Sequence, residues 1–233
     1  MKKYVFTLSM LVMLAFASSL SAGICASTTD CTLHFTQGNT SSGFGTADFG
    51  TLRLQLDTTT HVATLTVDLS SGFFSIDTGF PGAFGFADSL GGGLTGGGLP
   101  SGYSGFLSHA TNDLHFDGFG FANNAAATSA PAAGDAAALN VVSFTVSKST
   151  LTDVNQLLNL FSPAGGDGAV YFVADVINRN TSGPGAGLTG LIGITGSDPV
   201  VPEPTTYLGL LIPGLAAMAF VAERRRRKTE NVA

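Results

Sequence analysis

The sequence predicts a mainly β protein: a single β-sandwich or jelly-roll-like domain with one short covering helix, followed by a C-terminal transmembrane helix. Glycine accounts for 31 of the 233 residues and phenylalanine for 18, while tryptophan is absent. Short runs alternate between apolar and polar residues, as half-buried strands do. Few helical segments separate these runs, which argues against a parallel α/β fold.

Nine short runs are the expected strands. Residues 52–56 and 62–69 alternate on either side of a polar turn over 57–61, and they predict a hairpin with one apolar face. The other seven expected strands are 31–37, 72–76, 83–87, 114–121, 141–146, 169–176 and 188–194. The glycine-rich stretch 90–105 and the alanine-rich stretch 122–138 are expected to be loops.

One helix is expected between the last strands. Thr150, with Asp153 three residues later, is typical of a capping box at a helix start. Apolar residues then recur at helical spacing, and Pro163 ends the pattern. The apolar positions are Leu151, Val154, Leu157, Leu158 and Phe161. We expect this helix to cover an open end or edge of the sheets.

The N-terminus has the parts of a secretory signal peptide in the usual order. Lys2 and Lys3 precede an apolar run over 4–17, and small residues follow over 18–22. The apolar run has 14 residues, whereas about 20 are needed to cross the hydrocarbon core as a helix. We therefore expect export through the Sec translocon and removal of residues 1–22 by signal peptidase, with the cut after Ala22.

A second apolar segment, over 205–222, contains no charged residue in 18 positions. At about 1.5 Å per residue this segment spans about 27 Å, just short of the ~30 Å hydrocarbon core. A basic cluster over 224–228 follows, and because positive charge stays on the cytoplasmic side, the body of the chain is expected outside. The alternative, a buried hairpin or core helix, leaves the adjacent basic cluster unexplained.

Three features of the C-terminal region occur together. Pro202, Glu203 and Pro204 precede the apolar span, and the basic cluster begins with Arg224, Arg225, Arg226 and Arg227. Over residues 201–228 this arrangement resembles the PEP-CTERM sorting signal. The resemblance implies that 201–204 is the motif recognised by an exosortase and that the arginines stop transfer at the inner membrane. It also implies a transient anchor, removal of the tail, and delivery to the cell surface, the extracellular matrix or the medium.

The region between the two ends, residues 23–200, is expected to be one extracytoplasmic domain. From Gly23 to Pro204 the chain has three basic residues against thirteen aspartates and Glu203, a formal charge of −11. Such an acidic body argues against nucleic acid as a partner, since phosphate contacts need lysine and arginine. Cys25 and Cys31 both survive a cut after Ala22 and can pair in an oxidising compartment. A cut after Cys25 or Ala26 would leave Cys31 unpaired.

The candidates for a functional site in the body are few. Asp113, His115 and Asp117 would share one face of a strand, with His109 nearby, and could hold a metal or supply an acid and a base. The alternative is the polar outer face of a half-exposed strand with Leu114 and Phe116 inward. Calcium is considered because aspartate beside glycine offers oxygen ligands, although no Asp-x-Asp-x-Asp loop occurs. These aspartates are Asp117, Asp135, Asp167 and Asp175.

No catalytic motif accompanies these residues. The chain has no GxSxG nucleophile elbow, and its GxGxxG strings lack a helical pattern after them. Glu203, the one glutamate between Gly23 and Pro204, belongs to the sorting motif. We therefore expect a non-enzymatic surface or matrix protein associated with exopolysaccharide, without a cofactor. The alternative is a secreted carbohydrate-binding module or hydrolase carrying the same tail.

Overall fold

The computed structural model describes residues 24–79, 81–183 and 185–196. The expected signal peptide (1–22), sorting motif (201–204), membrane span (205–222) and basic cluster (224–228) lie outside these residues. Within the described part, none of the helices has the length and hydropathy to cross a bilayer.

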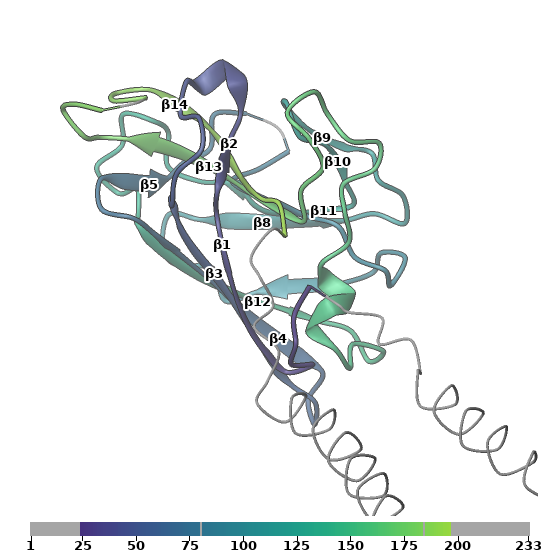
Figure 1. The fold of residues 1–233 in the computed structure, drawn as a ribbon. Coiled ribbons are helices and arrows are strands. Elements are labelled where there is room, and N and C mark those ends of the chain that lie inside the picture. The colour runs from purple at the N-terminus through teal and green to yellow at the C-terminus, as the bar shows by residue number, and fades with distance from the viewer. Residues whose placement is uncertain (1–23, 80, 184, 197–233) are drawn as a thin grey trace, which may run out of the picture.

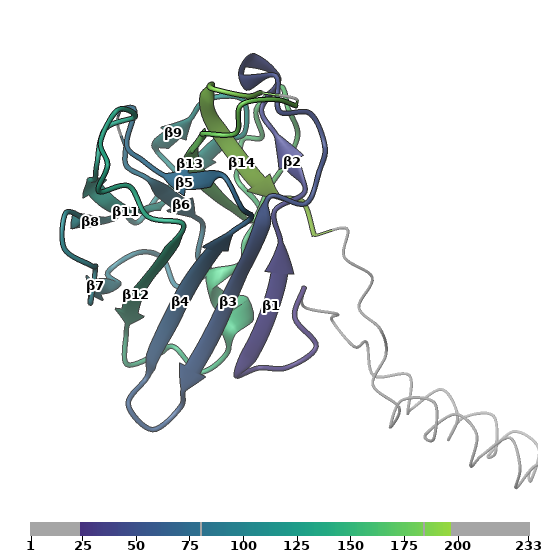
Figure 2. The same ribbon diagram turned by 90° about the vertical axis from the view of Figure 1, so that its left-hand side faces the viewer.

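Two sheets, packed face to face, form the body (Figure 1). The first has five strands in the order β1–β3–β4–β12–β7, and β12, β4, β3 and β1 lie side by side in Figure 2. Its pairings are antiparallel. The bounds are β1 (Asp30–His34), β3 (Gly50–Asp57), β4 (Val62–Leu69), β12 (Val141–Ser147) and β7 (Thr95–Gly97).

The second sheet has the order β2–β14–β13–β6–β11–β8, and β5 also pairs with β13. A separate two-stranded hairpin, β9–β10, covers part of its outer face. The bounds are β2 (Gln37–Gly38), β5 (Phe73–Ser75), β6 (Phe84–Phe86), β8 (Ser104–Ser108), β9 (Leu114–Phe116), β10 (Gly120–Ala122), β11 (Asn124–Ser129), β13 (Phe172–Asn178) and β14 (Thr189–Ile194). This architecture confirms the mainly β prediction and is consistent with a sandwich.

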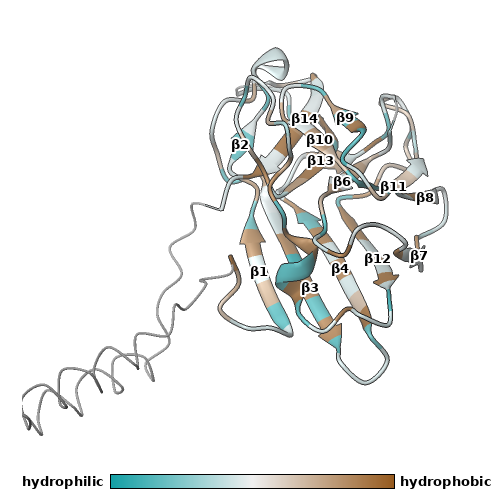
Figure 3. Ribbon diagram, turned by 90° about the vertical axis from the view of Figure 1, so that its right-hand side faces the viewer, coloured by the Kyte–Doolittle hydropathy of each residue, from teal (hydrophilic) through white to brown (hydrophobic). Residues whose placement is uncertain are grey.

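The main core lies between the two sheets. Along β3 every second residue from Gly50 onward is buried, so one face of the strand enters the core and the other meets solvent. The alternation is visible as bands of colour along the strands in Figure 3. Phe144 of β12 stacks on Phe84 of β6, with ring centroids 5.7 Å apart, and so joins the two sheets. This cross-sheet contact is typical of sandwich packing.

A second, smaller core lies on the outer face of the second sheet. Leu114 and Phe116 of β9 are buried there against Val173 of β13 and Ala125 of β11. The side chain of His115, between them, is half exposed. The run 114–121, expected as one strand, is therefore the hairpin β9–β10, because Asp117, Gly118 and Phe119 form its turn.

Several strand predictions are confirmed and two loop predictions are wrong. The hairpin β3–β4 forms where it was expected, with β4 at the predicted bounds. The stretch 90–105 contains β7 and the start of β8, and the stretch 122–138 contains β11. Residues 124–127 of β11 are all buried because β11 lies between β6 and β8 and both of its faces are covered. Alanine is apolar but small, so this strand has none of the large-residue alternation that marks the others.

The helix expected over 150–161 is also wrong. The segment has one 3₁₀ turn, η2 (Val154–Leu157), capped by Asp153 with Gln156 rather than by Thr150. After this turn, backbone amides of the segment donate to carbonyl groups outside it. Asn159 N–H donates to Ala87 O at 2.8 Å, and Phe161 N–H donates to Val170 O at 2.9 Å. Apolar spacing predicted a helix, but the amides of the segment are satisfied by residues that flank β6 and β13 instead.

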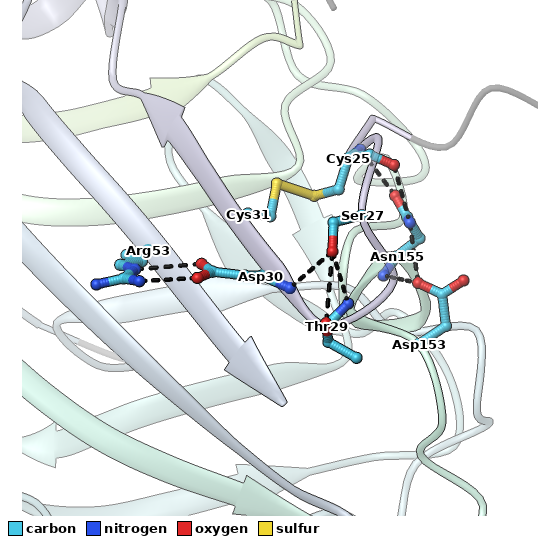
Figure 4. Close-up of a disulfide and its surroundings, with 8 residues drawn as sticks. All are labelled: Cys25, Ser27, Thr29, Asp30, Cys31, Arg53, Asp153 and Asn155. Carbon is cyan, nitrogen blue, oxygen red and sulfur yellow. Dashed lines mark hydrogen bonds and ion pairs between the residues drawn. A yellow bond between two sulfur atoms is a disulfide. The ribbon is translucent and has the colours of Figure 1, made fainter. Parts of the chain in front are cut away.

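The N-terminal end of the described chain is fastened to η2 (Figure 4). Cys25 and Cys31 form a disulfide, which confirms the predicted pair. Cys25 N–H donates to Asn155 Oδ1 at 2.9 Å, and Asn155 Nδ2 donates to Cys25 O at 3.2 Å. Asp153 orients this amide by accepting from Asn155 Nδ2 at 2.9 Å. The segment that follows the expected cleavage site is therefore an integral part of the fold.

Candidate functional site

A polar cleft of about 220 Å³ lies where four segments meet over the second sheet. These segments are β13 with β14, the loop before β6, the 3₁₀ turn η1 (Thr40–Ser42) and the β9–β10 turn. In Figure 1, η1 and β9 lie at the same end of the molecule. The lining consists of Asn39, Ser41, Thr78, Gly79, Pro81, Gly82, His115, Phe116, Asp117, Asp175, Thr189, Gly190 and Leu191.

Asp175 is the buried carboxylate of this cleft. It lies on β13 two residues after Val173, and because side chains alternate along a strand, both project to the outer face. Only 3% of the residue is exposed. Its Oδ2 accepts hydrogen bonds from Thr78 N–H at 2.8 Å and from Thr78 Oγ1 at 2.5 Å. Its Oδ1 is also buried but has no hydrogen-bond partner among the described residues.

Burial raises the pKa of Asp175 to about 6. A charged carboxylate loses hydration when it is taken out of water, which favours the protonated form. The hydrogen bonds from Thr78 act in the opposite direction, and the nearby charge of Asp77 adds to the increase. The pKa of Asp77 is itself raised by burial. The cleft therefore contains a carboxyl group that changes charge near neutral pH.

Asn39 holds η1 against β14, and so forms one wall. Its N–H donates to Leu191 O at 2.9 Å, and its Oδ1 accepts from Leu191 N–H at 3.3 Å. Its Nδ2 donates to Ser41 Oγ at 2.8 Å, so the proton of the Ser41 hydroxyl remains available for another acceptor. The close approach of η1 to β14 requires glycine at position 190, since a Cβ there would lie 2.3 Å from Ser42 Cβ.

The end of β9 and the β9–β10 turn form a second wall. His115 Nδ1 lies 3.4 Å from Asp117 Oδ1, and the His115 ring contacts the Phe121 ring with centroids 4.7 Å apart. Gly118 permits the turn to approach the segment that holds Asp167, because a Cβ at 118 would lie within 2.1 Å of Asp167 Oδ2. The carboxylate of Asp167 accepts hydrogen bonds from the backbone N–H and the hydroxyl of Thr40, and so joins this turn to η1.

The four residues suggested by the sequence separate into two pairs. His109 Nδ1 lies 2.6 Å from Asp113 Oδ1, outside the cleft, while His115 and Asp117 line the cleft. The arrangement around β9 matches the polar outer face weighed as the alternative, with Leu114 and Phe116 inward. Across the described residues, no three His, Cys, Asp or Glu side chains come together in a group that could hold a metal ion.

The aspartates considered for calcium have different surroundings. Asp175 and Asp117 line the cleft. Asp167 instead accepts a hydrogen bond from Thr40 N–H, and Asp135 accepts one from Ala137 N–H in a turn. Sequence reasoning missed Asn39, Ser41 and Thr78 as members of the site. They reach the cleft from positions more than 30 residues from His115, and no local motif connects them.

Comparison with known proteins gives no assignment for this site or this fold. The chain matches no protein-family model, no curated protein and no solved structure. A function for the chain is therefore inferred from its sequence and from the geometry and chemistry of the described residues.

Proposed function

We propose that this chain is an exported cell-envelope or extracellular-matrix protein, sorted and processed by an exosortase and associated with exopolysaccharide without catalysing a reaction. Its partners in delivery are the Sec translocon, signal peptidase, the inner membrane and the exosortase. The order of motif, apolar span and arginine cluster over 201–228 carries this proposal.

The disulfide supports export. Cys25 and Cys31 are bonded, and such bonds persist in oxidising compartments such as the periplasm and the cell exterior. Cys25 lies three residues after the expected cut at Ala22. A stable disulfide at this position fits a mature chain that begins before Cys25.

The placement of the two ends of the described domain also supports the proposal. A Cβ at Gly196 would lie 2.9 Å from Ile24 Cδ1, so the first and last described residues are neighbours in space (Figures 1 and 2). Both views place the cleft elements η1 and β9 away from this junction. A domain with adjacent ends has both ends close to one membrane during export, before the signal peptide is removed, while its far side remains accessible.

The sorting motif provides the test. In the double variant Pro202→Ala/Glu203→Ala, we expect the unprocessed chain to accumulate in the inner-membrane fraction, detected by immunoblot with antiserum against the body. The matched control is Pro199→Ala, which changes a proline of the same segment outside the motif and should be processed normally. Unchanged processing and release of the double variant would refute the sorting proposal.

One observation favours the enzymatic alternative. Asp117 and Asp175 line the same cleft, and the pKa of Asp175 is raised to about 6, a pattern found where one carboxyl acts as an acid and another as a base. A glycoside hydrolase would release reducing ends from a polysaccharide, and Asp117→Asn would abolish that release. Absence of release with binding intact would support the non-enzymatic proposal.

A further inference from the structure

The charge of the cleft restricts the ligands that it can accept. Asp117 and Asp175 contribute two carboxylates, and no lysine or arginine is among the described lining residues. An anionic ligand would place like charges close together in a partly buried site, which is unfavourable. The ligand class is therefore neutral or cationic.

Asp175 indicates that a hydrogen-bond donor is missing from this site. Buried polar atoms in folded proteins nearly always have a hydrogen-bond partner, so an exception needs a specific reason. Oδ2 of Asp175 has two donors from Thr78, whereas the buried Oδ1 has no donor in hydrogen-bond geometry, although the backbone N–H of Val176 is close enough to the carboxyl to lower its pKa. A ligand group that donates to Oδ1 would supply the missing bond. Hydrogen bonds to a charged acceptor are among the stronger ones.

The mixture of groups favours a hydroxyl-rich ligand over a metal cation. Calcium takes six to eight oxygen ligands, typically with several carboxylates, whereas no three His, Cys, Asp or Glu side chains of the described residues come together in a group that could hold a metal ion. The lining instead combines acceptors with donors, since Ser41 Oγ already accepts from Asn39 and can donate its own proton. A sugar hydroxyl both donates and accepts, and so matches such a lining. Pro81, Phe116 and Leu191 add a small apolar area for the carbon face of a ring.

We propose that this cleft binds one exposed unit of a neutral saccharide, with hydroxyl groups donating to Asp175 and Asp117 and accepting from Ser41. The inference deepens the proposed association with exopolysaccharide and rests on that function for the source of the ligand. Binding is measured without export, however, so failure of sorting and failure of binding are separate results.

The test measures binding by the full chain in a sugar-free zwitterionic detergent, because alkyl glycoside detergents would compete for the cleft. Isothermal titration at pH 7.5 would use methyl glycosides of glucose, galactose and mannose, neutral polysaccharides, and glucuronic acid as the anionic probe. We expect saturable binding of at least one neutral probe, no binding of glucuronic acid, and the same affinity in the presence of a calcium chelator.

Two variants and one control locate the site. Asp175→Asn keeps the shape of the side chain but removes its charge, and Asp117→Asn does the same in the β9–β10 turn. Each should weaken binding by roughly 10-fold or more, as expected for the loss of a charge-assisted hydrogen bond. Asp113→Asn changes an aspartate that is paired with His109 outside the cleft and should bind like the wild type. Thermal unfolding of each variant distinguishes lost contacts from lost fold.

Three results would overturn the inference. Absence of binding by any neutral probe would show that the cleft is not a saccharide site. Binding that requires calcium or is abolished by the chelator would indicate a cation site instead. Binding that survives both Asp175→Asn and Asp117→Asn would place the saccharide elsewhere on the molecule.

Discussion

At the scale of single residues, Asp175 couples the stability of the fold to pH. Its pKa in the folded chain is about 6, above the ordinary value of 3.8, and burial is the main cause. Between pH 4 and pH 6 the folded state therefore holds a proton that the unfolded state has released. Stability contributed by this group falls as pH rises through that window and is constant above it. Asp77 is the charge that acts on it, and Asp117 and His115 are the other titratable groups of the same cleft.

The variant Asp175→Asn tests this coupling. An amide cannot ionise, so at pH 7 the variant avoids a desolvation cost of roughly 2–3 kcal/mol. We expect it to be more stable than the wild type at pH 7, with a difference that shrinks toward zero at pH 4. Urea unfolding at pH 4, 5, 6 and 7 measures the effect. A control with the opposite sign is Asp30→Asn, because Arg53 lowers the pKa of Asp30 and the substitution removes a favourable ion pair.

Residues of the candidate site differ in how far the sequence could reveal them. His115 and Asp117 were found because they lie two positions apart within a predicted strand and so share one of its faces. Asp175 was visible only as one of several aspartates, since its burial depends on the β9–β10 hairpin packing over the second sheet. Thr78 enters the site through two hydrogen bonds across a separation of 97 residues. Such a contact is set by the three-dimensional packing and has no signature in local sequence.

At the scale of elements, alternation of large apolar and polar residues predicted strands reliably. The prediction failed where the buried side chains of a strand are small. The hairpin β3–β4 shows its buried face in sequence through leucine and valine at every second position. Strand β11 carries Ala125, Ala126 and Ala127 where large residues would have marked a strand, although all three are fully buried. Their small volume allows the β9–β10 hairpin to pack closely on one face of β11 and the main core to pack closely on the other face.

This close packing makes β11 intolerant of larger side chains. Ala125 faces the small core, together with Phe116 and Val173. In Ala125→Val, the added methyl groups should strain a filled site and cost about 1–3 kcal/mol of unfolding free energy. Chemical denaturation measures this cost, and Ala136→Val, at an exposed position, is the matched control with little expected effect. Equal stability of the two variants would show that β11 is not packed on both faces.

The 3₁₀ turn η2 owes its conformation to a cap and not to helical periodicity. Asp153 accepts hydrogen bonds from Asn155 N–H at 2.8 Å and from Asn155 Nδ2 at 2.9 Å. Asp153→Ala should therefore lower the unfolding free energy by about 1 kcal/mol and loosen the amide that holds Cys25. Asp153→Asn keeps an acceptor oxygen and should restore most of the loss. Thermal unfolding of the three chains gives the comparison, and equal midpoints would contradict a role for the cap.

At the scale of the whole molecule, the N-terminal segment joins export to folding. The disulfide, the Asn155 clamp and the contact of Ile24 with the Gly196 end fasten the chain from its first described residue. Cleavage after Cys25 or Ala26 would remove one half of the disulfide and both clamp hydrogen bonds. We therefore predict that mass spectrometry of the exported chain finds an N-terminus at Gly23 and a disulfide between Cys25 and Cys31. A mature chain that begins after Cys25 would contradict this prediction.

The contribution of the bridge itself depends on its short loop. Cys25 and Cys31 are six residues apart, and closing such a loop in the unfolded chain corresponds to about 2 kcal/mol in the chain-entropy model. The double variant Cys25→Ser/Cys31→Ser should therefore lose about that much unfolding free energy and still fold, because the two sheets do not depend on the bridge. Reductant should lower the stability of the wild type to the level of the double variant and leave the double variant unchanged. If reductant has the same effect on both proteins, the disulfide does not stabilise the domain. The hydrogen bonds between Asn155 and Cys25 would then have to hold this segment in place without it.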